Sequence, residues 1–127
     1  VDDDRRFLDS LTRVLTRHGY NVTAFTDPVR ALEAVPSTGA QMAIVDLRMA
    51  GMNGWELTRA LNDKFGAKLP VVILSALGSD GEISRGYGAG ASYYITKPCE
   101  PRRVLNIVDY LIGNLDSKQK EELEAKL

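Results

Sequence analysis

Residues 42–54 read Met42-Ala-Ile-Val-Asp46-Leu-Arg-Met-Ala-Gly-Met-Asn-Gly54, and this stretch decides the fold. Its first four residues are apolar and too few to form a helix before glycine and asparagine turn residues follow. Such a run predicts a buried strand of a parallel sheet. Asp46 comes directly after this strand, at the carboxyl end where open α/β sheets place their ligands. We therefore take Asp46 as the candidate chemical centre.

Further strands and helices alternate on both sides of this stretch. Strand-forming side chains occupy residues 21–25, 70–75 and 93–97. Helical spacing of apolar residues, or a capping residue before proline, predicts helices within residues 7–18, 28–35, 54–65, 79–87 and 101–115. The second of these helices is expected to end before Pro36. The alternation predicts an α/β fold whose parallel sheet is covered on both faces.

Length and composition exclude several classes of protein. The chain of 127 residues has the length of one domain. Its formal net charge of −1 argues against a general basic surface, so we expect no direct nucleic-acid binding within these residues. The single cysteine, Cys99, excludes an internal disulfide and fits a reducing compartment. No apolar run approaches the roughly 20 residues of a membrane span and no signal peptide is visible, so we expect a cytoplasmic location without membrane contact.

Polar side chains stand at the ends of four predicted strands. The chain opens with Val1-Asp2-Asp3-Asp4, which we expect to be the end of a strand whose earlier residues are missing. Asp46, Ser75 and Lys97 end three further strands. Because parallel strands place their carboxyl ends along one edge, these groups are expected to converge there.

The converging groups make chemical sense as a set. Clustered carboxylates repel one another unless a cation neutralises them, and Mg²⁺ prefers such oxygen ligands. A carboxylate can attack phosphorus and form an aspartyl phosphate. The added charge then needs a metal, an ammonium such as Lys97 and a hydroxyl such as Ser75. His18 falls at the end of a predicted surface helix, which leaves no histidine for a serine–histidine hydrolase.

The chain resembles a receiver domain of a bacterial two-component response regulator over residues 1 to about 115. The resemblance rests on four motifs in order, each at a strand end: Val1-Asp2-Asp3, Asp46 through Gly54, Ser75-Ala76 and Lys97-Pro98. It implies a flavodoxin-like, doubly wound sheet of five parallel strands in the order 2-1-3-4-5. In this chain the first of those strands is largely missing.

The resemblance also implies a role for each site residue. Asp46 would accept the phosphoryl group. Asp2, Asp3, Asp46 and the backbone carbonyl of Arg48 would hold Mg²⁺, with Mn²⁺ as an alternative ion. Lys97 would pair with the phosphoryl oxygens, and Ser75 would contact the phosphoryl group and reorient on activation. Tyr94 matches the switch aromatic that moves inward with that hydroxyl residue.

The expected function follows from these roles. The domain, residues 1–115, would take a phosphoryl group from a histidine kinase or a histidine phosphotransfer protein, and would not be an enzyme acting on other molecules. Residues 116–127 would form a helical tail or the start of a linker. The surface of the fourth helix, fifth strand and fifth helix would contact a second copy or an output domain.

Two alternatives stay open at this point. One is a receiver that binds proteins without being phosphorylated, against which the intact acidic and lysine set argues. The other is a haloacid-dehalogenase-like phosphatase, which also uses a strand-end aspartate. That family needs a second aspartate two residues further on, where this chain has Arg48.

Overall fold

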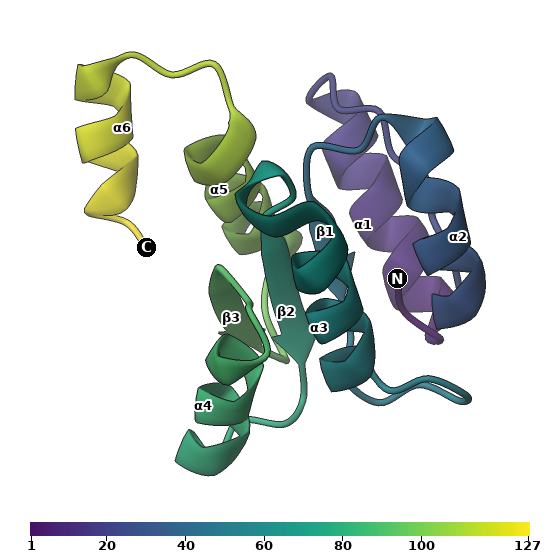
Figure 1. The fold of residues 1–127 in the computed structure, drawn as a ribbon. Helices are drawn as coiled ribbons and strands as arrows, with labels where there is room; N and C mark the ends of the chain where they lie inside the picture. The colour runs from purple at the N-terminus through teal and green to yellow at the C-terminus, as the bar shows by residue number, and fades with distance from the viewer.

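The computed structural model describes all residues 1–127 and shows an α/β fold (Figure 1). Three parallel strands lie in the order β1-β2-β3, with Ala43 opposite Val71 and Val72 opposite Tyr93. The strands are β1 (Ala43–Val45), β2 (Val71–Ser75) and β3 (Tyr93–Thr96). The helices are α1 (Arg5–Arg17), α2 (Pro28–Thr38), α3 (Gly54–Phe65), the 3-10 turn η1 (Gly66–Lys68), α4 (Asp80–Gly88), α5 (Pro101–Ile112) and α6 (Ser117–Glu124).

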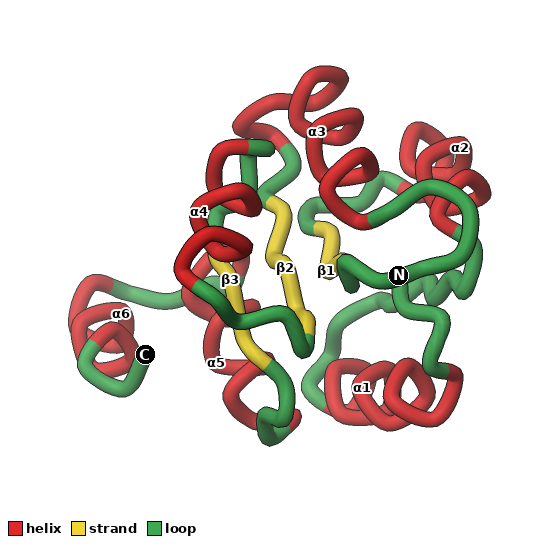
Figure 2. The backbone as a smooth tube through the Cα atoms, turned by 90° about the horizontal axis from the view of Figure 1, so that it is seen from below, coloured by secondary structure: helices red, strands yellow, loops and turns green.

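The central strand of the sheet, β2, is buried on both faces, and all of its residues except Ser75 are apolar. Val72 and Leu74 face one way, into a cluster with Leu11 of α1 and Val104 of α5. The alternate residues of the strand face the other way, toward α3 and α4. Viewed along the strands, α1 and α5 lie on one side of the sheet, with α3 and α4 on the other (Figure 2). This is the layered arrangement that a doubly wound sheet requires.

The helix starts follow the capping residues that the sequence supplies. Asp4, Asp27 and Asn53 each accept a hydrogen bond from a backbone N–H in the first turn of α1, α2 and α3. Ser79 and Glu82 form a reciprocal capping box at the start of α4. Each cap satisfies a backbone donor that the helix itself leaves free.

The end of α2 differs from the prediction. The helix was expected to end before Pro36, but it continues to Thr38 with Pro36 inside its last turn. The hydroxyls of Ser37 and Thr38 donate to carbonyls one turn back, at 2.9 and 3.0 Å. These bonds stabilise the last turn, in which Pro36 has no backbone N–H to donate. The helix ends at Gly39, which has a positive φ of 64°.

The first two strands of the predicted five-stranded order are not formed as strands. The strand predicted at residues 21–25 has no regular secondary structure and lies outside the sheet. One hydrogen bond, from Asp2 N–H to the Phe25 carbonyl at 3.1 Å, joins it to residue 2. Val1 lies beside β1, where its amine donates to the Ile44 carbonyl at 2.6 Å and its carbonyl accepts from Asp46 N–H at 2.9 Å.

A cavity borders this region of the chain. It has a volume of about 370 Å³ and a largely apolar lining, contributed by α1, α2, β1 and residues 21–25. Residues 21–25 therefore face the cavity and lack the neighbouring strand that would fix them in a sheet. The fold class is confirmed, while the sheet consists of the last three strands of the predicted order.

The last helix lies outside the sheet and beside α5 (Figure 1). Residues 116–127 were expected to be helical, and α6 forms there with Asp116 as its cap. None of its residues is buried, although the Lys120 ammonium lies 5.4 Å from the centre of the Tyr110 ring of α5. No helix in the molecule is both long enough and apolar enough to cross a membrane.

Candidate functional site

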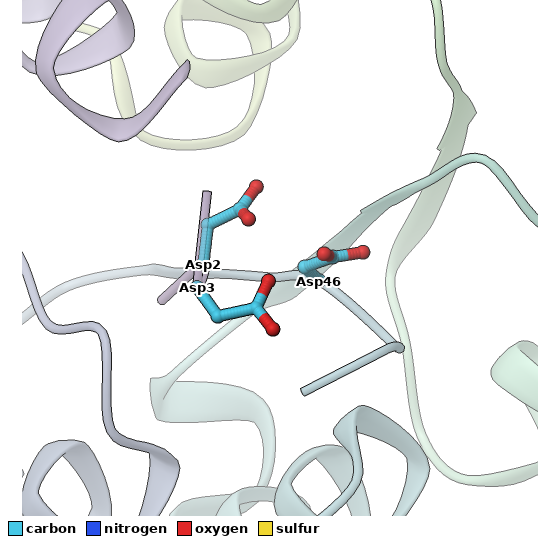
Figure 3. A group of neighbouring side chains, drawn as sticks. All are labelled: Asp2, Asp3 and Asp46. Carbon is cyan, nitrogen blue, oxygen red and sulfur yellow. The ribbon is translucent and has the colours of Figure 1, made fainter. Parts of the chain in front are cut away.

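The predicted site residues meet at one edge of the sheet. Asp46 follows β1, Ser75 is the last residue of β2, and Lys97 follows β3. The backbone N–H of Lys97 donates to the Ser75 carbonyl at 2.8 Å, which extends the pairing of β2 and β3 to this edge. Asp2 and Asp3 reach the same place because the chain start is bonded to β1, so Asp2 and Asp3 lie beside Asp46 (Figure 3).

Three carboxylates form the centre of the site. An oxygen of each of Asp2, Asp3 and Asp46 lies within 4.8 Å of the other two. Asp2 and Asp46 are buried, with 5% and 8% of their surface exposed, whereas Asp3 is exposed. Burial, followed by the negative charge of Asp2, raises the pKa of Asp46, and the Lys97 ammonium acts in the opposite direction. The site thus holds more negative charge than its own cation compensates.

Hydrogen bonds orient two of these carboxylates. Asp46 Oδ1 accepts from the backbone N–H of Leu47 at 2.8 Å, and Asp2 Oδ1 accepts from the backbone N–H of Asp4 at 2.9 Å. Each bond uses one carboxylate oxygen and fixes the plane of the group. The second oxygen of each side chain is the one that approaches Lys97.

Lys97 bridges the carboxylates. Its Nζ lies 2.7 Å from Asp2 Oδ2 and 3.9 Å from Asp46 Oδ2. The closer pair joins the chain start to the end of β3, residues 95 positions apart. The ammonium is therefore within reach of the nucleophile candidate while it is bonded to a neighbouring acid.

Ser75 and Tyr94 are joined through the loop after β2. Ser75 is buried, with 1% of its surface exposed, and its Oγ accepts from the backbone N–H of Leu77 at 3.2 Å. The Tyr94 hydroxyl donates to the carbonyl of the same Leu77. Tyr94 is itself buried, and burial is the main cause that raises the pKa of its hydroxyl. Gly86 of α4 passes so close that a Cβ there would lie 2.9 Å from the Tyr94 ring.

The loop after Asp46 brings α3 against the site. Arg48 is exposed in this loop, and its role as a carbonyl ligand stays a prediction. Gly54 begins α3, and a Cβ at this position would lie 2.1 Å from the Asp46 carbonyl oxygen. Sequence reasoning treated Gly54 only as a turn residue and helix start. The spacing of a glycine eight residues after a strand-end acid gave no reason to expect this close approach.

The donor set fits a hard divalent cation. Three carboxylates within a few ångströms offer oxygen ligands and strong mutual repulsion, which a divalent cation relieves. The absence of histidine or cysteine from the cluster disfavours a softer transition metal. Asp2, Asp3 and Asp46 are the residues that would hold Mg²⁺, in agreement with the donor types predicted from the sequence.

Several known proteins have similar sequences, and two of the three described below are named response regulators. PetR of Rhodobacter capsulatus is 36% identical over 105 residues, which cover 83% of this chain and 44% of PetR. The DNA-binding response regulator MtrA of Mycobacterium tuberculosis is 32% identical over 123 residues, 97% of this chain and 53% of MtrA. The heme response regulator HssR of Staphylococcus epidermidis is 29% identical over 98% of this chain and 54% of HssR. The chain spans about half the length of these curated relatives.

Solved structures give the same fold. The receiver domain of the Francisella response regulator 1452 superposes with a TM-score of 0.80 at 26% identity, covering 87% of this chain and 90% of that one. The BeF3-activated DrrB receiver domain superposes with a TM-score of 0.79 at 25% identity, covering 87% of this chain and 91% of that one.

The family model described as "Response regulator receiver domain" matches residues 1–109. The chain therefore belongs to the family of response regulator receiver domains.

Proposed function

We propose that this receiver domain accepts a phosphoryl group on Asp46, in a reaction that depends on Mg²⁺. The donor would be a phosphohistidine of a histidine kinase or of a histidine phosphotransfer protein in the cytoplasm. One observation carries the proposal: the buried carboxylate of Asp46 lies among two further carboxylates and 3.9 Å from the Lys97 ammonium. Such a grouping supplies a nucleophile together with the charges that its phosphorylated form requires.

The proposed step is a displacement at phosphorus. A carboxylate oxygen of Asp46 forms a bond to phosphorus while the phosphorus–nitrogen bond of the donor breaks. The donor imidazole keeps the electron pair, and the phosphoryl group remains on Asp46. Bound Mg²⁺ would lower the repulsion between the acid cluster and the incoming phosphoryl oxygens. Lys97 is placed to exchange part of its contact with Asp2 for a contact with the new phosphoryl group.

The proposed switch begins at Ser75. If its hydroxyl turns to donate to the phosphoryl group, the present bond from Leu77 N–H to Ser75 Oγ is lost. Since Tyr94 donates to the carbonyl of Leu77, displacement of this loop would also change the hydrogen bond that holds the Tyr94 hydroxyl. Gly86 lies against the Tyr94 ring, so the change reaches α4. We infer that the surface formed by α4, β3 and α5 has a different affinity for a second copy or an output domain after phosphorylation.

The proposal is tested by intact-mass measurement. The chain is incubated with acetyl phosphate and Mg²⁺, beside samples containing EDTA and a sample in which Mn²⁺ replaces Mg²⁺. A gain of one phosphoryl group with either ion, absent with EDTA and in Asp46→Asn, supports the proposal. Circular dichroism verifies that all samples are folded. A folded wild-type chain that gains no mass would favour the alternative of a domain that binds proteins without phosphorylation.

A further inference from the structure

The Lys97 ammonium has a third neighbour besides the two carboxylates. Its Nζ lies 4.3 Å from the centre of the Phe7 ring, over the ring face. At that distance a cation is attracted by the electron density of the ring, and the attraction grows when water is excluded. The Lys97 side chain is only 18% exposed, so much of the water around it has already been removed.

Phe7 is held in place by the same segment that holds Asp2. It lies in the first turn of α1, where its backbone N–H donates to the capping carboxylate of Asp4 at 3.3 Å. The backbone N–H of Asp4 in turn donates to Asp2 at 2.9 Å. The ring is partly buried and packs against the apolar cluster beneath α1 and α5. One short segment therefore presents both an acid and an aromatic face to Lys97.

The two contacts differ in how they respond to a cation at the site. If Asp2 held a metal ion, the ion would compete with Lys97 for the charge of that carboxylate and would weaken the 2.7 Å pair. The phenyl ring carries no formal charge and offers no ligand to a hard cation, so the metal does not compete for it. The flexible stem of lysine would otherwise let the freed ammonium turn into water.

We propose that Phe7 is a positioning residue for Lys97, whose ring keeps the ammonium at the site when a cation draws Asp2 away. The inference rests on the proposed function, because it concerns how fast Asp46 takes up its phosphoryl group. Phe7 itself touches no reacting atom. It acts by limiting the positions that the Lys97 ammonium occupies.

The test compares Phe7→Leu with Phe7→Tyr. Leucine keeps an apolar side chain at this position but has no ring, whereas tyrosine keeps the ring. We expect Phe7→Leu to slow phosphorylation by acetyl phosphate and Mg²⁺ about threefold to tenfold, and Phe7→Tyr to stay within about twofold of wild type. Phe65→Leu removes a partly buried phenylalanine at the end of α3 and serves as the control, with an unchanged rate.

A spectroscopic readout separates positioning from packing. Protons on Cε of Lys97 lie close to the ring face, so ring currents should shift their NMR signals upfield in the wild type. We expect that shift to persist when Mg²⁺ is added and in Phe7→Tyr, and to vanish in Phe7→Leu. Lys97→Met identifies the signals by their loss.

Results that would overturn the role of Phe7 differ from the result that would overturn the proposed function. Equal rates for Phe7→Leu and wild type, a slow Phe7→Tyr, or a Lys97 shift that Mg²⁺ abolishes would each overturn the inference. If the wild-type chain takes up no phosphoryl group at all, the proposed function fails. The NMR shift in the presence of Mg²⁺ still decides whether Phe7 holds the ammonium.

Discussion

The sheet and the first third of the chain contribute to the same site in different ways. Asp46, Ser75 and Lys97 stand at the ends of paired strands, and the central strand, β2, is buried along its whole length. Asp2 and Asp3 belong to a segment outside the sheet, held by three backbone bonds to residues 25, 44 and 46 and bordered by a cavity of about 370 Å³.

The difference shows where the site is fixed and where it depends on other contacts. A parallel ladder fixes the nucleophile candidate, the hydroxyl and the backbone of Lys97 with respect to one another. The acid pair keeps its place through a few hydrogen bonds and the ion pair from Lys97 to Asp2. Substitutions that change side-chain volume should therefore destabilise the protein more when they lie in or against the sheet than when they lie in the first third of the chain. The following changes test that contrast, starting with the largest effect.

Gly54→Ala should be the most damaging single change. A Cβ at residue 54 would lie 2.1 Å from the carbonyl oxygen of Asp46 and 2.5 Å from Leu47 Cα, and both of these atoms are backbone. Backbone atoms after a paired strand cannot move aside cheaply, so we expect the free energy of unfolding to fall by about 3 to 5 kcal/mol. Urea denaturation measures this change.

Gly81→Ala is the matched control for that variant. Gly81 is also in the first turns of a helix, α4, but a Cβ there would meet no atom within 4 Å. Alanine should leave the stability unchanged or raise it by up to about 1 kcal/mol, because glycine is a poor helix former. A Gly54→Ala protein as stable as Gly81→Ala would contradict the tight approach of α3 to the strand end.

Leu105→Ala and Leu8→Ala compare the two regions directly. Leu105 of α5 is 3% exposed within the cluster beneath the sheet, and Leu8 of α1 is 9% exposed and borders the cavity. We expect Leu105→Ala to lower the free energy of unfolding by about 3 kcal/mol and Leu8→Ala by about half as much, because Leu8 borders the cavity and lies outside the clusters of buried apolar side chains. Equal losses would indicate that the first third of the chain is packed as tightly as the rest.

Tyr20→Phe removes a link between the regions. The Tyr20 hydroxyl, just after α1, donates to the carboxylate of Asp109 in α5. Losing this bond at a half-buried position should lower the free energy of unfolding by about 1 kcal/mol at neutral pH. Urea denaturation of both proteins at several pH values provides the measurement.

The pH dependence of this link has a definite sign. Burial, followed by the bond to Asp109, raises the pKa of Tyr20 above its ordinary value of 10.0. The folded state thus holds the proton more tightly than the unfolded state. The stabilisation is complete below about pH 10 and is lost as the pH rises toward the folded-state pKa. The stability gap between wild type and Tyr20→Phe should therefore shrink above pH 10; a gap that widens would contradict the assignment.

Much of the sheet side was predictable from the sequence. Residues 54–65 form α3 with the predicted bounds, because Asn53 caps its start and Gly66 follows its end. The strands predicted at residues 70–75 and 93–97 form within one residue of those limits, because apolar runs between turn residues permit few alternatives. The convergence of Asp46 and Lys97 then followed from parallel topology, whereas Asp2 and Asp3 reach the site through hydrogen bonds of a segment outside the sheet.

The remaining features depend on contacts between distant segments. Residues 21–25 have the composition of a strand, but a strand forms only where a neighbour completes the ladder. Phe7 matched the apolar spacing of a helix, and nothing in that spacing indicated that its ring would face Lys97. Pro36 would end most helices, and only the hydroxyl bonds of the two residues after it show why α2 continues.

The most direct test of the central claim locates the modified residue. The chain is phosphorylated with acetyl phosphate and Mg²⁺, reduced with sodium borohydride, digested and sequenced by tandem mass spectrometry. Borohydride reduces an aspartyl phosphate to homoserine and leaves free aspartates unchanged. We expect homoserine at position 46 and unmodified Asp2 and Asp3. Homoserine at either of those acids, with Asp46 unmodified, would contradict the assignment of Asp46 as the phosphoacceptor.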